Sequence, residues 1–172
     1  SLKAIMGIAG YGILKGMSGN AEDEEKYVSM ARDMAKDWAE RAANEDGSYR
    51  LAFDVEGSFS MKYNIVWDSL LGYNLFSDEV KKNEIKVYLS KMNRYGVPLD
   101  SRSDYTKLDW MAWTTVMTDH ETYTKKVFTS IARMICESED RVPVTDWDFT
   151  SDAKHTGFQA RSVLGGLYIN LL

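Results

Sequence analysis

The sequence predicts an all-α protein, and two patterns support that prediction. Apolar residues recur at the three- and four-residue spacing of helices along most of the 172-residue chain, and no segment keeps the alternating pattern of a strand. The predicted helices also alternate in character: some are apolar on nearly all sides, and others are charged with a single apolar stripe. Because the first kind is buried and the second faces water, inner and outer helices are expected to pair.

About seven helices follow in order from these patterns. The first spans about 2–17 and ends at Gly19, which suits a helix C-terminus. The second spans about 21–44 and begins after Asn20, whose side chain can accept a bond from a free backbone N–H. The remaining helices are expected at about 62–76, 78–93, 107–118, 119–138 and 160–172.

The connections between the predicted helices alternate between short and long. A short turn makes an antiparallel hairpin of the two helices that it joins, and each hairpin returns the chain to the same end of the molecule. The sequence therefore predicts a partial α/α toroid of three hairpins and a final helix, formed by residues 1–172 as one domain. An irregular helical bundle is the alternative. The long connections, which would meet at one mouth of the toroid, are 45–61, 94–106 and 139–159.

Charge and composition exclude several classes of function. The chain has 21 Lys and Arg against 26 Asp and Glu, a net charge of −5, which does not suit nucleic acid as the main partner. The sequence contains no run of about 18 apolar residues, which is the length that a membrane-spanning helix needs. His120 and His155 lack the spacing of a zinc site, and no phosphate-binding or dinucleotide-binding glycine loop is present. We therefore expect neither a metal ion nor a cofactor.

The long connections and the residues beside them carry the candidate site. Carboxylates supply acid and base groups, an Arg can hold a ligand carboxylate with two bonds, and Trp and Tyr rings pack against carbon skeletons. This mixture predicts a site for a small polar solute. The alternative is that the rings are core residues and the Arg–Asp pairs only pin loops. The catalytic candidates are Asp146, Asp100, Lys107 and Asp109, and the substrate-binding candidates are Arg102, Arg161, Tyr63, Asn64, Trp67, Asp68, Trp110, Trp147 and Gln159.

Three stretches of the chain resemble, in order, the C-terminal part of the glutaminase A family. They are KYNIVWDSLLGYNLF, YGVPLDSRSDYTKLDWMAWT and VPVTDWDFTSDAKHTGFQARSVLGGLYINLL. The resemblance implies a six-hairpin toroid domain and the hydrolysis of glutamine to glutamate and ammonia. It also implies secretion or attachment to the cell envelope, as in fungal and Bacteroidetes members, and an N-terminal remainder of the same polypeptide. The chain departs from the family pattern at Ser162, where Pro is expected, and at Asp148, where an aromatic residue is usual.

The resemblance leaves the chemical roles open. No Ser or Cys stands in a nucleophile context, so the expected nucleophile is a water activated by Asp146 or Asp100. Arg102 or Arg161 would hold the substrate carboxylate, and Lys107 would stabilise the developing charge. A glycoside hydrolase and a non-catalytic helical binding module are the alternatives, with a sugar in place of glutamine in the first case. The 172-residue chain alone is expected to be inactive and to self-associate, because a partial toroid exposes apolar surface.

Overall fold

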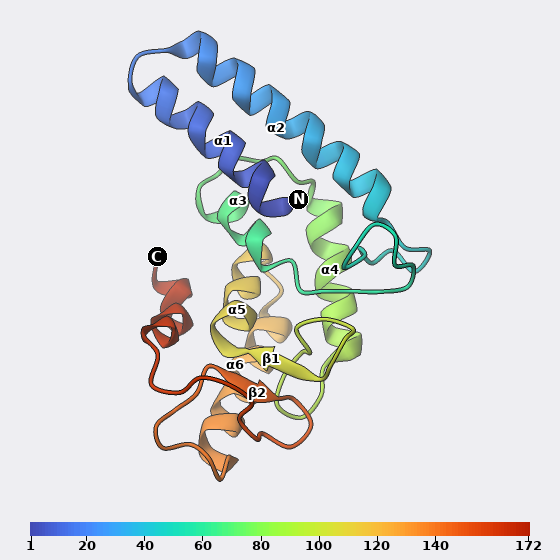
Figure 1. The fold of residues 1–172 in the computed structure, drawn as a ribbon, viewed down its shortest axis with the longest axis vertical. Coiled ribbons are helices and arrows are strands. Elements are labelled where there is room, and N and C mark those ends of the chain that lie inside the picture. Colours follow the sequence, from blue (N-terminus) through green and yellow to red (C-terminus); the bar gives the residue numbers. More distant parts are fainter.

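The structure, a computed structural model, describes residues 1–172 and is rich in helices, as the sequence predicts (Figure 1). A long hairpin of α1 (Leu2–Met17) and α2 (Ala21–Ala42) projects at one end, and α6 and β2 lie towards the other. None of the helices combines the length and apolar character that a bilayer span requires. The remaining elements are α3 (Val66–Leu70), α4 (Asp78–Lys91), β1 (Tyr105–Lys107), α5 (Leu108–Trp113), α6 (Glu121–Glu137) and β2 (Trp147–Phe149), with 3₁₀-helices at Tyr63–Ile65, Thr114–Met117 and Ser162–Leu171.

The predicted first hairpin, formed by α1 and α2, is confirmed. Capping interactions at the ends of the two helices explain the turn between them. The Asn20 side chain accepts a hydrogen bond of 3.0 Å from the backbone N–H of Asp23, so it satisfies one free donor at the start of α2. Gly19 has a φ of +88°, which a residue without Cβ adopts at little cost. This conformation lets the Asn20 N–H donate back to the Lys15 carbonyl across 2.9 Å and close the end of α1.

Three predicted helices differ from what forms, and the one expected at 107–118 forms as α5 continued by the 3₁₀-helix Thr114–Met117. The helix expected at 62–76 is shorter, because the chain leaves α3 after Leu70 and then takes positive φ angles at Gly72 (+66°) and Asn74 (+55°). Left-handed residues cannot continue a right-handed helix, and they turn the chain towards α4. The final helix forms as the tighter 3₁₀-helix Ser162–Leu171.

The prediction that the chain contains no sheet is wrong. β1 and β2 form a two-stranded antiparallel sheet in which Tyr105 pairs with Phe149 and Lys107 pairs with Trp147. Aromatic and β-branched residues dominate both strands, which suits a pleated, half-buried surface. Each strand has only three residues, too few to show a period of two in the sequence. The sheet joins the second long connection to the third.

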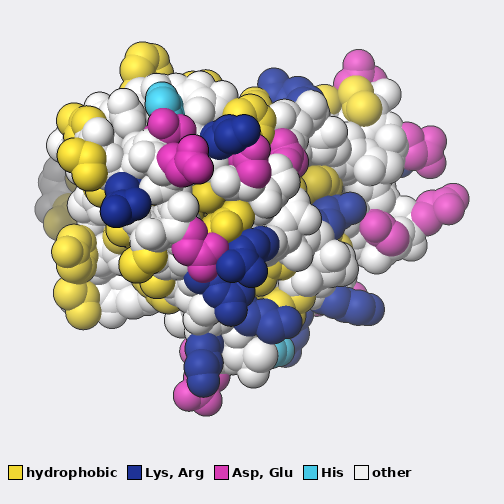
Figure 2. All heavy atoms as spheres, turned by 90° about the horizontal axis from the view of Figure 1, so that it is seen from below, with side chains coloured by type: hydrophobic (Ala, Val, Ile, Leu, Met, Phe, Trp, Pro, Cys, Tyr) yellow, Lys and Arg dark blue, Asp and Glu magenta, His cyan; other side chains and the backbone are white.

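The apolar core has two parts. One part lies among α4, α5 and α6, and the other lies beneath the α1–α2 hairpin, where the 3₁₀-helix Tyr63–Ile65 packs against α1. At the end formed by α6, acidic side chains lie among a group of Lys and Arg side chains, so that face carries no field of a single sign (Figure 2). Representative buried residues are Tyr88, Met111, Tyr123 and Val127 in the first part and Ile5, Ala35, Trp38 and Ile65 in the second.

The final 3₁₀-helix packs closely on α5 through Gly166. A Cβ atom at Gly166 would lie 2.7 Å from Trp113 Nε1 and 2.9 Å from Asp109 Cβ, whereas one at Gly165 would meet nothing within 4 Å. We expect Gly166→Ala to lower the free energy of unfolding by about 1–3 kcal/mol through overpacking. Gly165→Ala is the matched control and should leave stability nearly unchanged. Denaturant unfolding of both variants measures the difference, and equal midpoints would contradict this packing.

Candidate active site

The β1–β2 sheet brings the second and third connections together at the start of α5. Beyond the last register pair, the backbone N–H of Leu108 donates to the carbonyl of Asp146 across 2.9 Å. The ladder therefore ends where Lys107 and Asp146 lie side by side. Residues 39 positions apart in sequence become neighbours because the sheet fixes their register.

Asp146 lies between two cations. Lys107 Nζ donates to Asp146 Oδ2 across 2.7 Å, and the Arg161 guanidinium donates to the same oxygen across 3.4 Å. The Asp146 carboxylate is buried, with 1% of its side chain exposed. Three of the predicted site residues thus form one charged group, and Arg161 approaches it from the segment just before the final 3₁₀-helix.

Aromatic rings enclose the Lys107 ammonium group. Its Nζ atom lies 4.5 Å from the centroid of the Trp147 ring and 5.9 Å from that of Trp110, distances at which a cation is attracted to an aromatic face. Trp110 in turn stacks on Tyr63, with centroids 4.1 Å apart and planes 10° from parallel. Tyr63 follows the first long connection and Lys107 follows the second, so residues in or beside all three connections meet here.

Two more carboxylates lie close to this charged group. Burial raises the pKa of Asp109 more than the backbone N–H of Trp110 lowers it, and the negative charge of Asp146 raises it further. Burial also raises the pKa of Asp148 to about 7, Asp146 adds to the shift, and Lys107 opposes it. A carboxyl group that gains or loses its proton near neutral pH suits acid–base chemistry.

Polar atoms without a hydrogen-bond partner are concentrated in this region. Folded proteins pair nearly all buried polar atoms, so such a concentration marks a place that other molecules would complete. Every buried side-chain N or O atom that lacks a partner comes from β1, α5 or the third connection with β2. These atoms are Thr106 Oγ1, Asp109 Oδ1, Trp113 Nε1, Asp146 Oδ1, Trp147 Nε1 and both carboxylate oxygens of Asp148; His155 Nδ1 makes no hydrogen bond either, but it lies within ion-pair distance of the Asp140 carboxylate.

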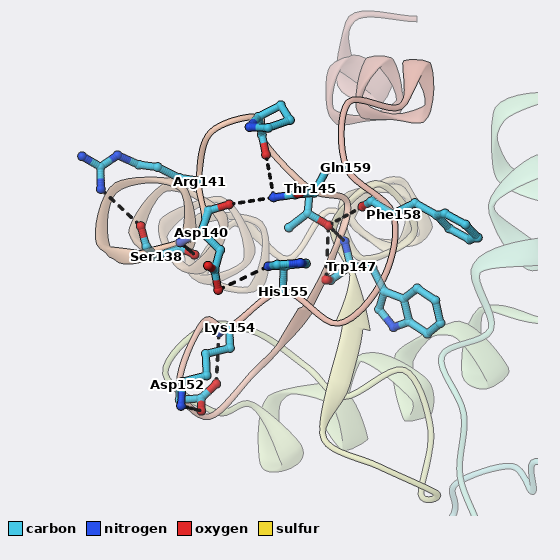
Figure 3. A network of polar contacts seen from close by, with 11 residues as sticks. Ser138, Asp140, Arg141, Thr145, Trp147, Asp152, Lys154, His155, Phe158 and Gln159 are labelled. Carbon is cyan, nitrogen blue, oxygen red and sulfur yellow. Dashed lines mark hydrogen bonds and ion pairs between the residues drawn. The ribbon is translucent and has the colours of Figure 1, made fainter.

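The third connection is braced by its own polar contacts (Figure 3). Gln159 Nε2 donates to the carbonyls of Asp140 (3.0 Å) and Pro143 (3.1 Å), and His155 Nδ1 lies 3.2 Å from the Asp140 carboxylate. In Figure 3 the Trp147 ring points away from this network. The predicted substrate-binding residue Gln159 thus has its amide donors engaged in holding the loop that presents Trp147.

Asp100 and Arg102 bind each other instead of joining the charged group. Arg102 donates from Nε to Asp100 Oδ1 (2.8 Å) and from a terminal nitrogen to Oδ2 (2.7 Å). Burial favours the neutral form of Asp100, but these bonds from Arg102 outweigh it and lower the pKa of Asp100. Asp100 also bridges Ser60 of the first connection through the backbone. This pair therefore pins the second connection, as the alternative interpretation of the sequence states.

Three further predicted residues lie in other surroundings. Asp68 is fully buried, accepts from the backbone N–H of Leu75 (2.7 Å) and pairs with Lys81 (2.9 Å), so its carboxylate braces the loop between α3 and α4. Trp67 meets the ring of Trp113 edge to face, with centroids 5.3 Å apart. Asn64 lines a separate cavity of about 660 Å³ beside Trp38, Arg50 and Lys62.

The structure also adds to the site a carboxylate of the third connection, Asp148, that the predicted catalytic residues do not include. Asp148 lies on β2 two positions after Asp146, and its register partner on β1 is Thr106. The spacing of two positions between Asp146 and Asp148 is a signal in the sequence that the two carboxylates lie near each other. Without a predicted strand, however, nothing in the sequence placed Asp148 opposite Thr106 on the neighbouring strand.

Comparisons with known proteins agree with the resemblance in the loop sequences. The sequence model of a family described as "Glutaminase A six helical-hairpin domain" matches residues 1–171. A protein named "Glutaminase A" from Aspergillus oryzae (strain ATCC 42149 / RIB 40) is 28% identical over 178 residues, covering 100% of this chain and 26% of the relative. A protein named "Probable glutaminase" from Arthroderma benhamiae (strain ATCC MYA-4681 / CBS 112371) is 25% identical over 197 residues, covering 96% and 23%. The chain thus spans about a quarter of the length of these curated relatives. No solved structure matches it.

Proposed function

Because the chain belongs to the glutaminase A six-helical-hairpin family, we propose that it carries part of the active site of an amidohydrolase that converts glutamine to glutamate and ammonia. The observation that carries this proposal is the group of Lys107, Asp146 and Arg161 beside the buried carboxyl of Asp109. A base, a cation for the developing negative charge and a cation for the substrate carboxylate are the groups that this hydrolysis requires.

Asp109 is the proposed general base. Its Oδ1 atom is buried and has no hydrogen-bond partner, and its raised pKa makes it a stronger base than an exposed carboxylate. Asp109 takes a proton from a water molecule as the water oxygen bonds to the side-chain amide carbon of glutamine. The resulting tetrahedral species collapses when the carboxyl of Asp109 returns the proton to the amide nitrogen. The carbon–nitrogen bond breaks, and ammonia and glutamate leave.

The two cations have separate proposed roles. Lys107 has three N–H donors and gives one to Asp146, so it can donate another to the oxyanion of the tetrahedral species. The side chain of Arg161 is 39% exposed, and it can bind the α-carboxylate of glutamine from the solvent side. Asp146 has both cations as partners, so its role is to position them. This role replaces the predicted one of Asp146 as the base.

The larger architecture and the cellular location are part of the same proposal. An α/α toroid forms when further hairpins of the full-length polypeptide continue the arrangement that begins with α1 and α2. Exposed apolar side chains on α1, such as Tyr11, Leu14 and Met17, give those hairpins a surface to cover. We also propose secretion or attachment to the cell envelope, which rests on the resemblance to glutaminase A.

The test is an assay of the full-length protein for ammonia release. Glutamine, asparagine and short aryl glycosides are offered in parallel, and ammonia and free sugar are measured. We expect ammonia from glutamine and no sugar release. Sugar release without ammonia would favour the glycoside hydrolase alternative, for which the stacked rings of Tyr63 and Trp110 offer a platform. If a folded protein releases neither product, the proposed function is wrong.

A further inference from the structure

A groove beside α6 is lined by positive charge. It lies between α6 and the C-terminal end of α4, and its volume of about 500 Å³ is in the range of sites for small molecules. Four cations line it: Arg94, Lys125, Lys126 and Arg133. No Asp or Glu lines it, although the whole chain has a net charge of −5 and the face at the end of α6 is mixed in sign. The groove therefore differs from the surface around it and favours an anion.

Three of these cations have no ion-pair partner. Lys125, Lys126 and Arg133 lie in the middle of α6, whereas its only acidic residues, Glu121 and Glu137, stand at its two ends. None of the three cations forms an ion pair with a carboxylate of the chain. Lys125 and Arg133 are about two helical turns apart, so the positive charge extends along one row of the helix. An anion in the groove would be attracted by several cations at once.

Arg94, the fourth cation, is held in place on the opposite wall. Its Nε atom and one terminal nitrogen donate to Glu137 Oε2 across 3.2 and 2.8 Å, and its guanidinium lies 5.4 Å from the centroid of the Tyr95 ring. The other terminal nitrogen makes no bond in the chain, so its N–H donors are free. The neighbouring Asn93 side chain donates to Thr150 Oγ1 across 2.8 Å and fixes the backbone at this point. This wall is therefore preorganised for a ligand.

A nearly enclosed hydroxyl group adds a neutral donor to the groove. Ser130 lines the groove with only 4% of the residue exposed. Its hydroxyl makes no hydrogen bond with the chain and is not among the completely buried atoms, so it can be reached from the groove. Buried polar groups are normally paired, and a ligand in the groove would supply the missing partner. Leu89 and Met92 give the same groove an apolar part that suits carbon atoms.

We propose that this groove binds a small phosphate monoester. A phosphate group carries a charge of about −1.5 to −2 at pH 7 and has three strong acceptor oxygens, which match the cations and the free N–H and O–H donors. A carboxylate has one charge and two oxygens, so it would leave more of these donors unused. The organic part of the ester would pack on Leu89 and Met92. The inference does not depend on the proposed function, because no residue of the groove belongs to the candidate active site.

The experiment is calorimetric titration of the full-length protein with glycerol phosphate at low ionic strength. We expect saturable binding that is tighter than that of inorganic phosphate, because only the ester has carbon atoms for the apolar part of the groove. Arg133→Gln should weaken the binding of glycerol phosphate by about tenfold, since it removes a charge-assisted hydrogen bond. Arg32→Gln makes the same change at an exposed residue of α2 that forms no ion pair, and it should bind like the unmodified protein.

A second variant tests the shape of the groove without changing its charge. Ser130→Ala removes one hydroxyl group and keeps all four cations, so it should weaken the binding of glycerol phosphate by about fivefold. A general attraction of anions to the positive surface predicts no change in this variant. Thermal unfolding of each variant shows that it is folded.

Four results would overturn the proposal: no saturable binding of glycerol phosphate, equal affinity for inorganic phosphate, unchanged affinity in Ser130→Ala, or equal losses in Arg133→Gln and Arg32→Gln. A hexaglutamate peptide is titrated in parallel. Tighter binding of this peptide than of glycerol phosphate would also overturn the proposal and would assign the groove to an acidic protein segment.

Discussion

Replacement of Asp109 by Asn should lower kcat for ammonia release from glutamine by about a thousandfold, the scale of a lost general base. The side chain keeps its shape and loses only its ability to take a proton. In the unmodified protein, kcat should rise with pH as the carboxyl ionises, and the raised pKa of Asp109 moves this rise above the ordinary range of Asp. The pH–rate profile of Asp109→Asn should lack that rise.

The matched control for this prediction is Asp104→Asn in the connection that precedes β1 and α5. Asp104 offers its backbone carbonyl to Thr150, but its side chain takes part in no hydrogen bond or ion pair. This variant should keep the activity and the pH profile of the unmodified protein. A folded Asp109→Asn protein with normal kcat would remove Asp109 from the mechanism, and Asp148 would then be the next base to test.

Replacement of Lys107 by Met should lower the free energy of unfolding by about 3 kcal/mol. Met fills a similar volume, but Asp146 loses its 2.7 Å partner while its carboxylate stays buried. The loss falls at the lower end for a broken buried pair, because Arg161 still faces Asp146 at 3.4 Å. Denaturant unfolding at pH 7 measures the effect.

An exposed ion pair serves as the control for Lys107. Lys154→Met breaks the pair with Asp152, in which the Lys154 side chain is 68% exposed, and such pairs contribute little to stability. Similar losses in the two variants would mean that burial does not distinguish the pairs. A fully stable Lys107→Met protein would show that the group of Lys107, Asp146 and Arg161 can be opened without cost.

Elements with local signals were predictable from the sequence. α2 begins after Asn20 and α4 after Ser77, and each cap accepts the backbone bond that its residue type suggests. The sheet has no comparable signal in the sequence, because each strand is three residues long and the paired residues lie about 40 positions apart. The apolar periodicity also predicts a longer helix than α3. The chain changes direction at Gly72 and Asn74, which take positive φ angles.

The members of the site were easier to predict than their pairing. Lys107, Asp146 and Arg161 were expected from residue type, and the structure joins them. Asp100 and Arg102 carry the same kinds of functional group, yet they bind each other. Sequence spacing is compatible with either arrangement, because the partner of a carboxylate is decided by which backbones approach one another in three dimensions.

The short sheet has a consequence for the order of folding. Lys107 and Asp146 meet only after the intervening residues, which include α5 and α6, have closed into a loop. Loop closure costs chain entropy before any contact rewards it, so pairings distant in sequence form late. The helical hairpin α1–α2, whose contacts are local, can assemble early. The charged group therefore belongs to the last part of the chain to become ordered, and a partly folded molecule would already contain helices while lacking its reactive centre.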